Sequence, residues 1–207
     1  MSSNAAKTLR QSQFMLSAAD KKGFVSDTGA EIAFAGRSNA GKSSAINAIT
    51  EINNLARTSK TPGRTQLVNF FSVSENQRLV DLPGYGFAKV PARMKKQWHE
   101  LMQDYFTLRE SLQLIVLVMD VRHPFKPFDV QMLEWAEHYS VAVHILMTKA
   151  DKLKRGAAKN TLLKAQKELR AEFPEAQISI QLFSALDGQG VEAAQKLLIQ
   201  TLESQSQ

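Results

Sequence analysis

One short segment carries residue types suited to holding a phosphate group. It fits G-x-x-x-x-G-K-[S/T] and consists of Gly36, Arg37, Ser38, Asn39, Ala40, Gly41, Lys42, Ser43 and Ser44. Glycines let the backbone curl so that successive N–H groups face one phosphate, and a following helix adds its positive end. Lys42 would reach the β- and γ-phosphates, and the Ser43 hydroxyl would fill one position around magnesium. This phosphate loop (residues 36–44) predicts a nucleotide site without indicating which nucleotide.

A second segment could report whether the terminal phosphate is present. Asp81, Leu82, Pro83 and Gly84 follow a β-rich run. An aspartate at the end of a strand beside a phosphate loop can hold magnesium through a water. The Gly84 N–H could meet the terminal phosphate, so the chain beyond it would respond to hydrolysis. We refer to residues 81–84 as the sensing loop.

A third segment indicates which base is bound. Thr148, Lys149, Ala150 and Asp151 follow a buried apolar run, at the end of a strand where α/β proteins bind ligands. A carboxylate here accepts two hydrogen bonds from N1–H and N2–H of guanine, and adenine has no such pair of donors. Lys149 could lay its stem over the ring. We refer to residues 148–151 as the base-reading segment. After the next strand, Phe183, Ser184 and Ala185 could present a backbone amide to guanine O6.

The composition excludes several other classes of protein. The 207 residues include 26 Lys and Arg against 20 Asp and Glu, a net charge of +6 that favours polyanionic partners only modestly. The absence of cysteine excludes disulfides, thiolate zinc sites and a cysteine nucleophile. The longest aliphatic run, residues 114–119, is far shorter than the ~20 residues of a membrane span. Residues 1–30 contain no secretory apolar block, so a cytoplasmic location is expected.

The elements that must position these residues alternate along the chain. Strands are predicted over 31–35, 66–73, 77–82, 112–119, 141–147 and 178–183. Helices are predicted from residue 42 and over 94–108, 129–139, 161–173 and 191–202. This pattern predicts an α/β fold with a mostly parallel central sheet of about six strands, one antiparallel edge strand and helices on both faces. We expect a loose lead-in over 1–25, a single domain over 26–203 and a disordered tail over 204–207.

Taken together, the motifs resemble those of the translation-factor-related GTPases. In detail they are similar to the EngB family, within the Era/EngA/TrmE-like group. The resemblance rests on Gly36–Ser44, Lys60-Thr-Pro-Gly-Arg-Thr65, Asp81-Leu-Pro-Gly-Tyr-Gly86 and Thr148–Asp151, and extends over residues 25–200. It implies a P-loop GTPase fold, and GTP or GDP bound with Mg²⁺. An ATP-dependent kinase or ATPase is the weaker alternative, because Asp151 speaks against it.

The resemblance also assigns roles to individual residues. Thr65 corresponds to the switch threonine that closes on magnesium and the γ-phosphate, with Gly63 and Arg64 beside it and Thr61 as a competitor. The implied magnesium ligands are Ser43, Thr65 and Asp81. The implied catalytic residues are Lys42, Thr65 and Gly84.

Two positions bear on the rate of hydrolysis. Tyr85 stands where Ras-like GTPases place a glutamine that orients water, so hydrolysis that is slow without an activating partner or ion is expected. Asn39 matches an asparagine that in this group helps hold a monovalent cation. A potassium ion there would supply charge where an arginine finger otherwise does.

The implied cellular role is assembly of the large ribosomal subunit, with loss linked to defective cell division and septation. Basic residues that suit an RNA backbone lie near the predicted site: Lys60, Arg64, Lys89, Arg93, Lys95, Lys96, Lys149, Lys152, Lys154, Arg155 and Lys159. The expected partners are GTP or GDP and the large subunit or its rRNA, with no DNA and no membrane span, and a monomeric state. The alternative is a nucleotide-gated RNA- or ribosome-binding module with negligible GTPase activity.

Overall fold

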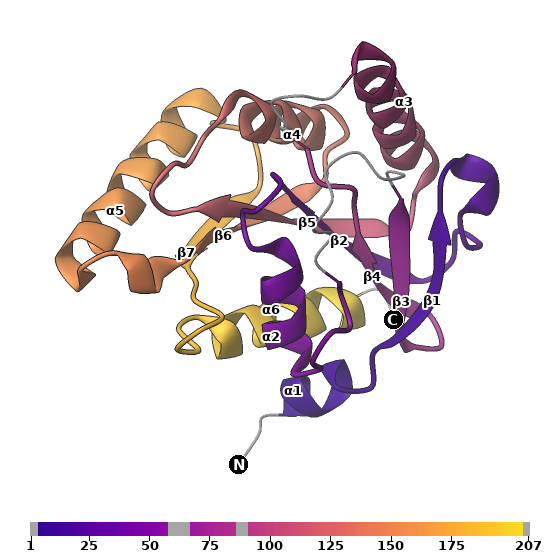
Figure 1. Cartoon of the computed structure of the whole chain (residues 1–207), viewed down its shortest axis with the longest axis horizontal. Coiled ribbons are helices and arrows are strands. Elements are labelled where there is room, and N and C mark those ends of the chain that lie inside the picture. Colours follow the sequence, from indigo (N-terminus) through magenta and orange to yellow (C-terminus); the bar gives the residue numbers. More distant parts are fainter. Residues whose placement is uncertain (1–3, 58–66, 86–90, 205–207) are drawn as a thin grey trace.

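The structure is a computed structural model that describes residues 4–57, 67–85 and 91–204. Its centre is one seven-stranded sheet in the order β1-β3-β4-β2-β5-β6-β7 (Figure 1). The strands are β1 (Gln13–Ala18), β2 (Ala30–Gly36), β3 (Val68–Ser74), β4 (Gln77–Asp81), β5 (Leu112–Asp120), β6 (Ala142–Thr148) and β7 (Ile178–Leu182). The predicted mostly parallel sheet is confirmed, with one strand more than expected.

Of the seven described strands, six point in the same direction, and β3 runs opposite to them near one side of the sheet. β4, β2, β5, β6 and β7 form the parallel part. β3 pairs antiparallel with β4, and β1 pairs antiparallel with β3 at the edge of the sheet. Since the parallel strands end at the same edge, the phosphate, sensing and base-reading segments meet there.

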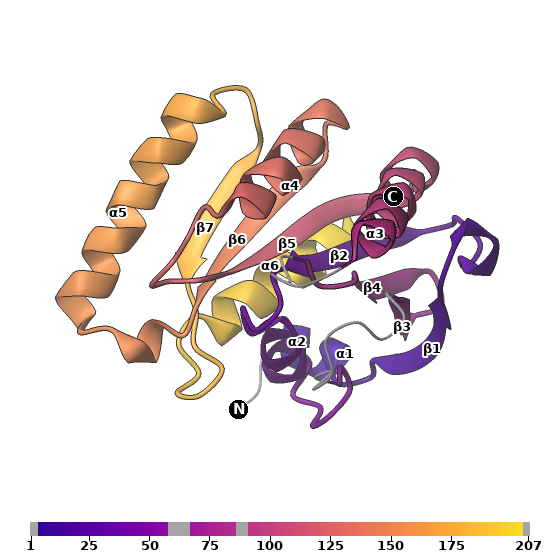
Figure 2. The same ribbon diagram turned by 45° about the horizontal axis from the view of Figure 1, so that its top comes forward.

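Helices cover both faces of the sheet (Figures 1 and 2). One face carries α3 (Ala92–Leu108), α4 (Pro127–His138) and α5 (Arg155–Glu172) over the larger apolar cluster. The other carries α1 (Asn4–Leu9), α2 (Lys42–Thr50) and α6 (Val191–Glu203). Short 3-10 turns, η1 (Lys21–Gly23) and η2 (Ala150–Lys152), complete the described elements. Over the described ranges, the helices are too short or too polar to cross a bilayer.

The N-terminal segment differs from the expected loose lead-in. α1 packs against α6 and α2, and β1 forms an edge strand of the sheet. The sequence hides this strand because Phe14 and Met15 stay exposed, so the two-residue alternation of a half-buried strand is missing. Its partners are also distant in the chain, with Gln13 opposite Ser72. A smaller difference is that α5 begins at residue 155 and not at the predicted 161. Its first turns are largely exposed, so they show no apolar spacing from which a helix could be predicted.

A buried charge cluster closes the end of the sheet opposite the predicted site. Glu31 is fully buried and accepts hydrogen bonds from Arg78 (Nε, 2.8 Å), Arg109 (Nε, 3.2 Å) and the Tyr105 hydroxyl (3.1 Å). Arg109 also donates to the Val25 carbonyl at 2.6 Å. The cluster therefore ties the chain before β2 to the end of α3, and each buried charge has a partner.

Candidate nucleotide site

The phosphate loop connects β2 to α2 through a tight turn. Gly36 passes so close to β5 that a Cβ there would lie 2.8 Å from the Val118 carbonyl oxygen. Asn39 (φ 64°) and Gly41 (φ 98°) adopt left-handed conformations, and the Ala40 N–H donates to the Arg37 carbonyl at 3.0 Å. Such a curled backbone before a helix N-terminus is the geometry that binds anions.

The base-reading segment supports the phosphate loop from β6. The Thr148 hydroxyl lies 2.5 Å from the Ala40 carbonyl oxygen and 3.0 Å from that of Met119. The Lys149 ammonium donates to the Asn39 carbonyl at 2.7 Å. The structure therefore brings two predicted segments together, although Ala40 and Thr148 are 108 residues apart in the chain. It also gives Thr148 a supporting role that the sequence did not reveal.

Lys42 and Asp81 meet at the junction of the phosphate and sensing loops. The Lys42 ammonium is paired with Asp81 Oδ1, and both side chains are largely buried. Burial lowers the pKa of Lys42 to about 7. An incoming phosphate would compete with Asp81 for this ammonium and would favour its charged form.

The side chains at this junction fit a magnesium ion. Ser43 and Asp81 offer a hydroxyl and a carboxylate oxygen, the hard donors that Mg²⁺ prefers. In the described part of the chain, no group of three His, Asp or Glu residues could hold a metal. The two oxygen donors of Ser43 and Asp81 suit Mg²⁺, which keeps several waters and phosphate oxygens as its other ligands.

The sensing loop lies directly against the phosphate loop. The Leu82 N–H donates to the Phe34 carbonyl at 3.0 Å, and the Ser38 N–H donates to the Tyr85 carbonyl at 2.9 Å. A Cβ on Gly84 would lie 3.6 Å from both the Gly36 carbonyl oxygen and the Ser38 nitrogen. The Gly84 backbone therefore lies directly beside the phosphate loop, and its contact with a terminal phosphate stays a prediction.

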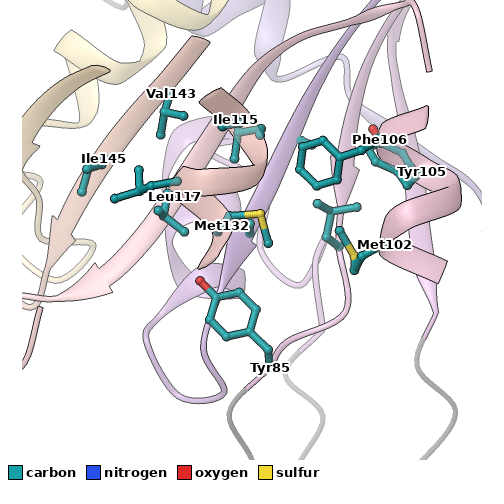
Figure 3. Packing of buried hydrophobic residues seen from close by; sticks show 14 of the residues in the cluster. Tyr85, Met102, Tyr105, Phe106, Ile115, Leu117, Met132, Val143 and Ile145 are labelled. Atoms are coloured by element: carbon teal, nitrogen blue, oxygen red, sulfur yellow. The ribbon is translucent and has the colours of Figure 1, made fainter. Parts of the chain in front are cut away.

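The Tyr85 side chain enters the core (Figure 3). It is 3% exposed and its hydroxyl donates to Asp129 Oδ1 at 3.0 Å. Burial raises the pKa of the Tyr85 hydroxyl, which therefore keeps its proton, and burial also raises the pKa of Asp129. A side chain held in this way does not orient a water at the phosphate.

The base-reading carboxylate is fixed from β7. The Ser184 hydroxyl donates to Asp151 Oδ1 at 2.9 Å, and the Lys152 ammonium lies 3.0 Å from Asp151 Oδ2. These contacts hold the pKa of Asp151 below its usual range, so it is charged at neutral pH. Phe183 accepts from the Ala150 N–H at 3.1 Å, and the Ser184 N–H donates to Gln189. The Ser184 amide is therefore engaged within this loop, and the backbone contact to guanine O6 stays a prediction.

Asp120 is a site residue that the sequence analysis missed. It ends β5 and lies 2.9 Å from the Lys149 ammonium and 2.7 Å from Arg122. The Arg122 guanidinium, and then Lys149, hold the pKa of Asp120 far below its ordinary value. Its place at the carboxyl end of a central strand was the available signal.

Some predicted residues lie outside the described part of the chain. These are Gly63, Arg64 and Thr65, the competitor Thr61, and the basic residues Lys60 and Lys89. Their roles stay predictions.

Comparisons with known proteins identify the family by sequence and the fold by structure. Residues 31–149 match the 50S ribosome-binding GTPase family. The probable GTP-binding protein EngB of Coxiella burnetii (strain CbuG_Q212) is 49% identical over 201 residues, covering 97% of each chain. A crystal structure of a probable GTP-binding protein engB shares the fold, with a TM-score of 0.67 and 22% identity over 84% of this chain and all of that chain. Era, solved with MgGDPNP and a 16S ribosomal RNA fragment, has a TM-score of 0.58 and 21% identity, covering 84% of this chain and 57% of that one. The chain therefore belongs to the EngB family of GTP-binding proteins and is a GTPase.

Proposed function

We propose that this GTPase acts in assembly of the large ribosomal subunit, and that normal cell division and septation depend on this role. The matching family is described as 50S ribosome-binding. The proposal also rests on a basic surface that the nucleotide site does not use.

That surface follows the base-reading segment directly. Lys149 and Lys152, which the sequence suggested for RNA, are paired with Asp120 and Asp151 inside the nucleotide site. α5 instead exposes cations at helical spacing on one side: Arg155, Lys159, Lys167 and Arg170. Within the described ranges, no ion pair involves these four residues. Leu163, at the centre of this row, is 53% exposed. An uncompensated basic row of this kind suits an RNA backbone.

We infer that the nucleotide chemistry is carried by the residues that the motifs predict, of which Thr65 lies outside the described part of the chain. The phosphate loop and Lys42 hold the phosphates, and the Asp151 carboxylate selects guanine through two hydrogen bonds. Gly84 and Thr65 contact the γ-phosphate, so the chain beside them differs between GTP and GDP. Ser43, Thr65 and Asp81 would hold Mg²⁺, which when bound neutralises charge on the phosphate oxygens.

Slow hydrolysis is part of the proposal. Tyr85 is held by Asp129 and does not orient water. We infer that a potassium ion at Asn39 supplies the missing positive charge, since Asn39 lies in the curled loop with a left-handed backbone. Hydrolysis is then expected to be faster in potassium than in sodium buffer. Equal rates would remove the ion from the mechanism.

The ribosome proposal is tested by co-sedimentation with 50S subunits. Binding is expected with a non-hydrolysable GTP analogue, to be weaker with GDP, and to fall as salt rises. Replacing Arg155, Lys159, Lys167 and Arg170 together by Gln should weaken binding by about tenfold or more. The control replaces Lys7, Lys21, Lys22 and Lys196 by Gln, the same change of charge on other surfaces. Binding that ignores the nucleotide, or equal losses in both variants, would contradict the proposal.

The buried Tyr85 also supports the alternative, a nucleotide-gated ribosome-binding module whose hydrolysis is unimportant in the cell. Multiple-turnover hydrolysis with and without 50S subunits separates the two. Stimulation by the subunits favours the assembly GTPase, and its absence favours the module.

A further inference from the structure

Two helices hold the far side of the sensing loop. On α3, the Trp98 indole N–H donates to the Pro83 carbonyl at 3.1 Å. On α4, Asp129 accepts from the hydroxyl of Tyr85, the residue that follows the loop, at 3.0 Å. All these groups are buried, so both hydrogen bonds are shielded from water and are costly to lose.

Asp129 is itself rigidly placed. It is 1% exposed and lies in the first turn of α4, where its second oxygen accepts from the Lys126 N–H at 3.0 Å. A carboxylate that only capped this helix could do so from the surface, where it would stay hydrated and would not incur the free-energy cost of desolvation. Here it is buried, and one of its two oxygens is directed to Tyr85.

Aromatic packing joins the two anchors into one unit. The ring centroids of Tyr85 and Trp98 lie 5.7 Å apart, and Phe128 contacts both rings. Trp98 stacks on Trp135 of α4 with centroids 5.8 Å apart. Figure 3 shows the Tyr85 ring directed toward the cluster that includes Met132 of α4. A shift of Tyr85 would therefore disturb several neighbours at once.

The other side of the same short segment is the phosphate loop. The Tyr85 carbonyl accepts from the Ser38 N–H, and a parallel bridge joins Arg37 and Tyr85. Gly84, whose amide is predicted to meet the γ-phosphate, lies between the two anchored residues Pro83 and Tyr85. The segment that carries this amide is therefore held from two sides, by the phosphate loop and by Asp129 and Trp98.

We propose that Asp129 is a positioning residue for GTP hydrolysis, acting through Tyr85 to hold the Gly84 amide at the phosphate loop, with Trp98 as the second anchor. Apart from the Arg37–Ser38 bridge to Tyr85, the described residues of 36–44 and 148–151 make no hydrogen bond to Tyr85, Trp98 or Asp129. Loss of the Asp129 anchor should therefore slow hydrolysis and leave GDP affinity unchanged. The inference does not depend on ribosome binding.

The test compares Tyr85→Phe, Asp129→Ala and the double variant in single-turnover GTP hydrolysis with bound Mg²⁺. Tyr85→Phe keeps the ring packing and removes one hydrogen bond, so the rate should fall about tenfold, with the dissociation constant for GDP within about twofold of wild type. If Asp129 acts through Tyr85, the double variant should be no slower than the slower single variant.

Two further variants complete the test. Asp129→Asn retains an oxygen that can accept from Tyr85, so it should recover most of the rate that Asp129→Ala loses, even if the alanine variant folds poorly. Glu192→Ala removes an exposed carboxylate in the first turn of α6 that is paired with Lys196 at 2.8 Å, and this variant should hydrolyse GTP like wild type. An unchanged rate in Tyr85→Phe, additive losses in the double variant, or a loss of GDP affinity as large as the loss of rate would each overturn the proposal.

Discussion

The two ends of the predicted nucleotide site are held in different ways. At the base end, Asp151, Lys149 and Thr148 are fixed by residues at the ends of neighbouring strands and by the phosphate loop. At the γ-phosphate end, the sensing loop is fixed by Trp98 and Asp129 on helices of the covering layer. The predicted base-binding residues are thus held by other residues at the same edge of the sheet. The predicted phosphate-sensing residues are held by side chains of α3 and α4. Changes at the first end should alter nucleotide affinity, and changes at the second should alter rate.

The largest effect is expected from Asp151→Asn. It removes the acceptor for two hydrogen bonds to guanine, so GTP affinity should fall by about a hundredfold or more, with a shift toward xanthosine triphosphate. Hydrolysis of bound nucleotide should stay near the wild-type rate, which single-turnover measurements at saturating nucleotide check. Asp187→Asn, in the nearby exposed loop, is the control. An unchanged preference for guanine would refute the assigned base reading.

A smaller effect that crosses the two regions is expected from Thr148→Val. Valine keeps the shape but removes the hydroxyl that contacts the Ala40 carbonyl, so the free energy of unfolding should fall by about 1–2 kcal/mol. GDP affinity should fall by about tenfold or less, because the phosphate loop loses a support. Denaturant unfolding and calorimetric titration measure the two effects. Thr201→Val removes a hydroxyl bonded to the Leu197 carbonyl of its own helix and should change stability alone.

The smallest expected effect is a pH dependence of stability that arises from a histidine on β6, bonded to two residues of β7. His144 on β6 is buried, with Nδ1 2.7 Å from Ser179 Oγ and Nε2 3.2 Å from Gln181 Oε1, and burial lowers its pKa below 6.5. As pH falls through 6.5, the unfolded chain binds a proton that the folded chain does not, so the free energy of unfolding decreases. Above that pH the contribution is constant.

Denaturant unfolding between pH 7 and pH 5 tests this dependence. The decrease should be smaller in His144→Asn than in wild type. His138→Asn, an exposed histidine at the end of α4, should behave like wild type. Parallel curves for wild type and His144→Asn would contradict the assignment.

Much of the architecture could be predicted because its signals are local. Buried strands form continuous apolar runs, such as residues 112–119, and the motifs follow strand ends, which parallel topology brings to one edge. These two facts were enough to place the phosphate loop and Asp151 at one site.

The residues that were missed owe their roles to tertiary contacts. The role of Asp120 depends on its ion pair with Lys149, which directly follows the neighbouring strand β6. Asp129 and Trp98 matter because α3 and α4 cross behind the sensing loop, which no sequence spacing encodes. Trp98 is buried, as an aromatic packing residue would be, and its indole N–H also donates to the Pro83 carbonyl.

The pairing of β1 with β3 has a practical consequence for how the protein is handled. The family match begins at residue 31, yet the sheet begins at residue 13. A shortened polypeptide that starts near residue 20 would leave β3 with an open hydrogen-bonding edge, and Phe71 would lose its contact with Phe14. Open apolar edges of this kind promote strand-to-strand association, so such a fragment is expected to self-associate even with every nucleotide motif intact.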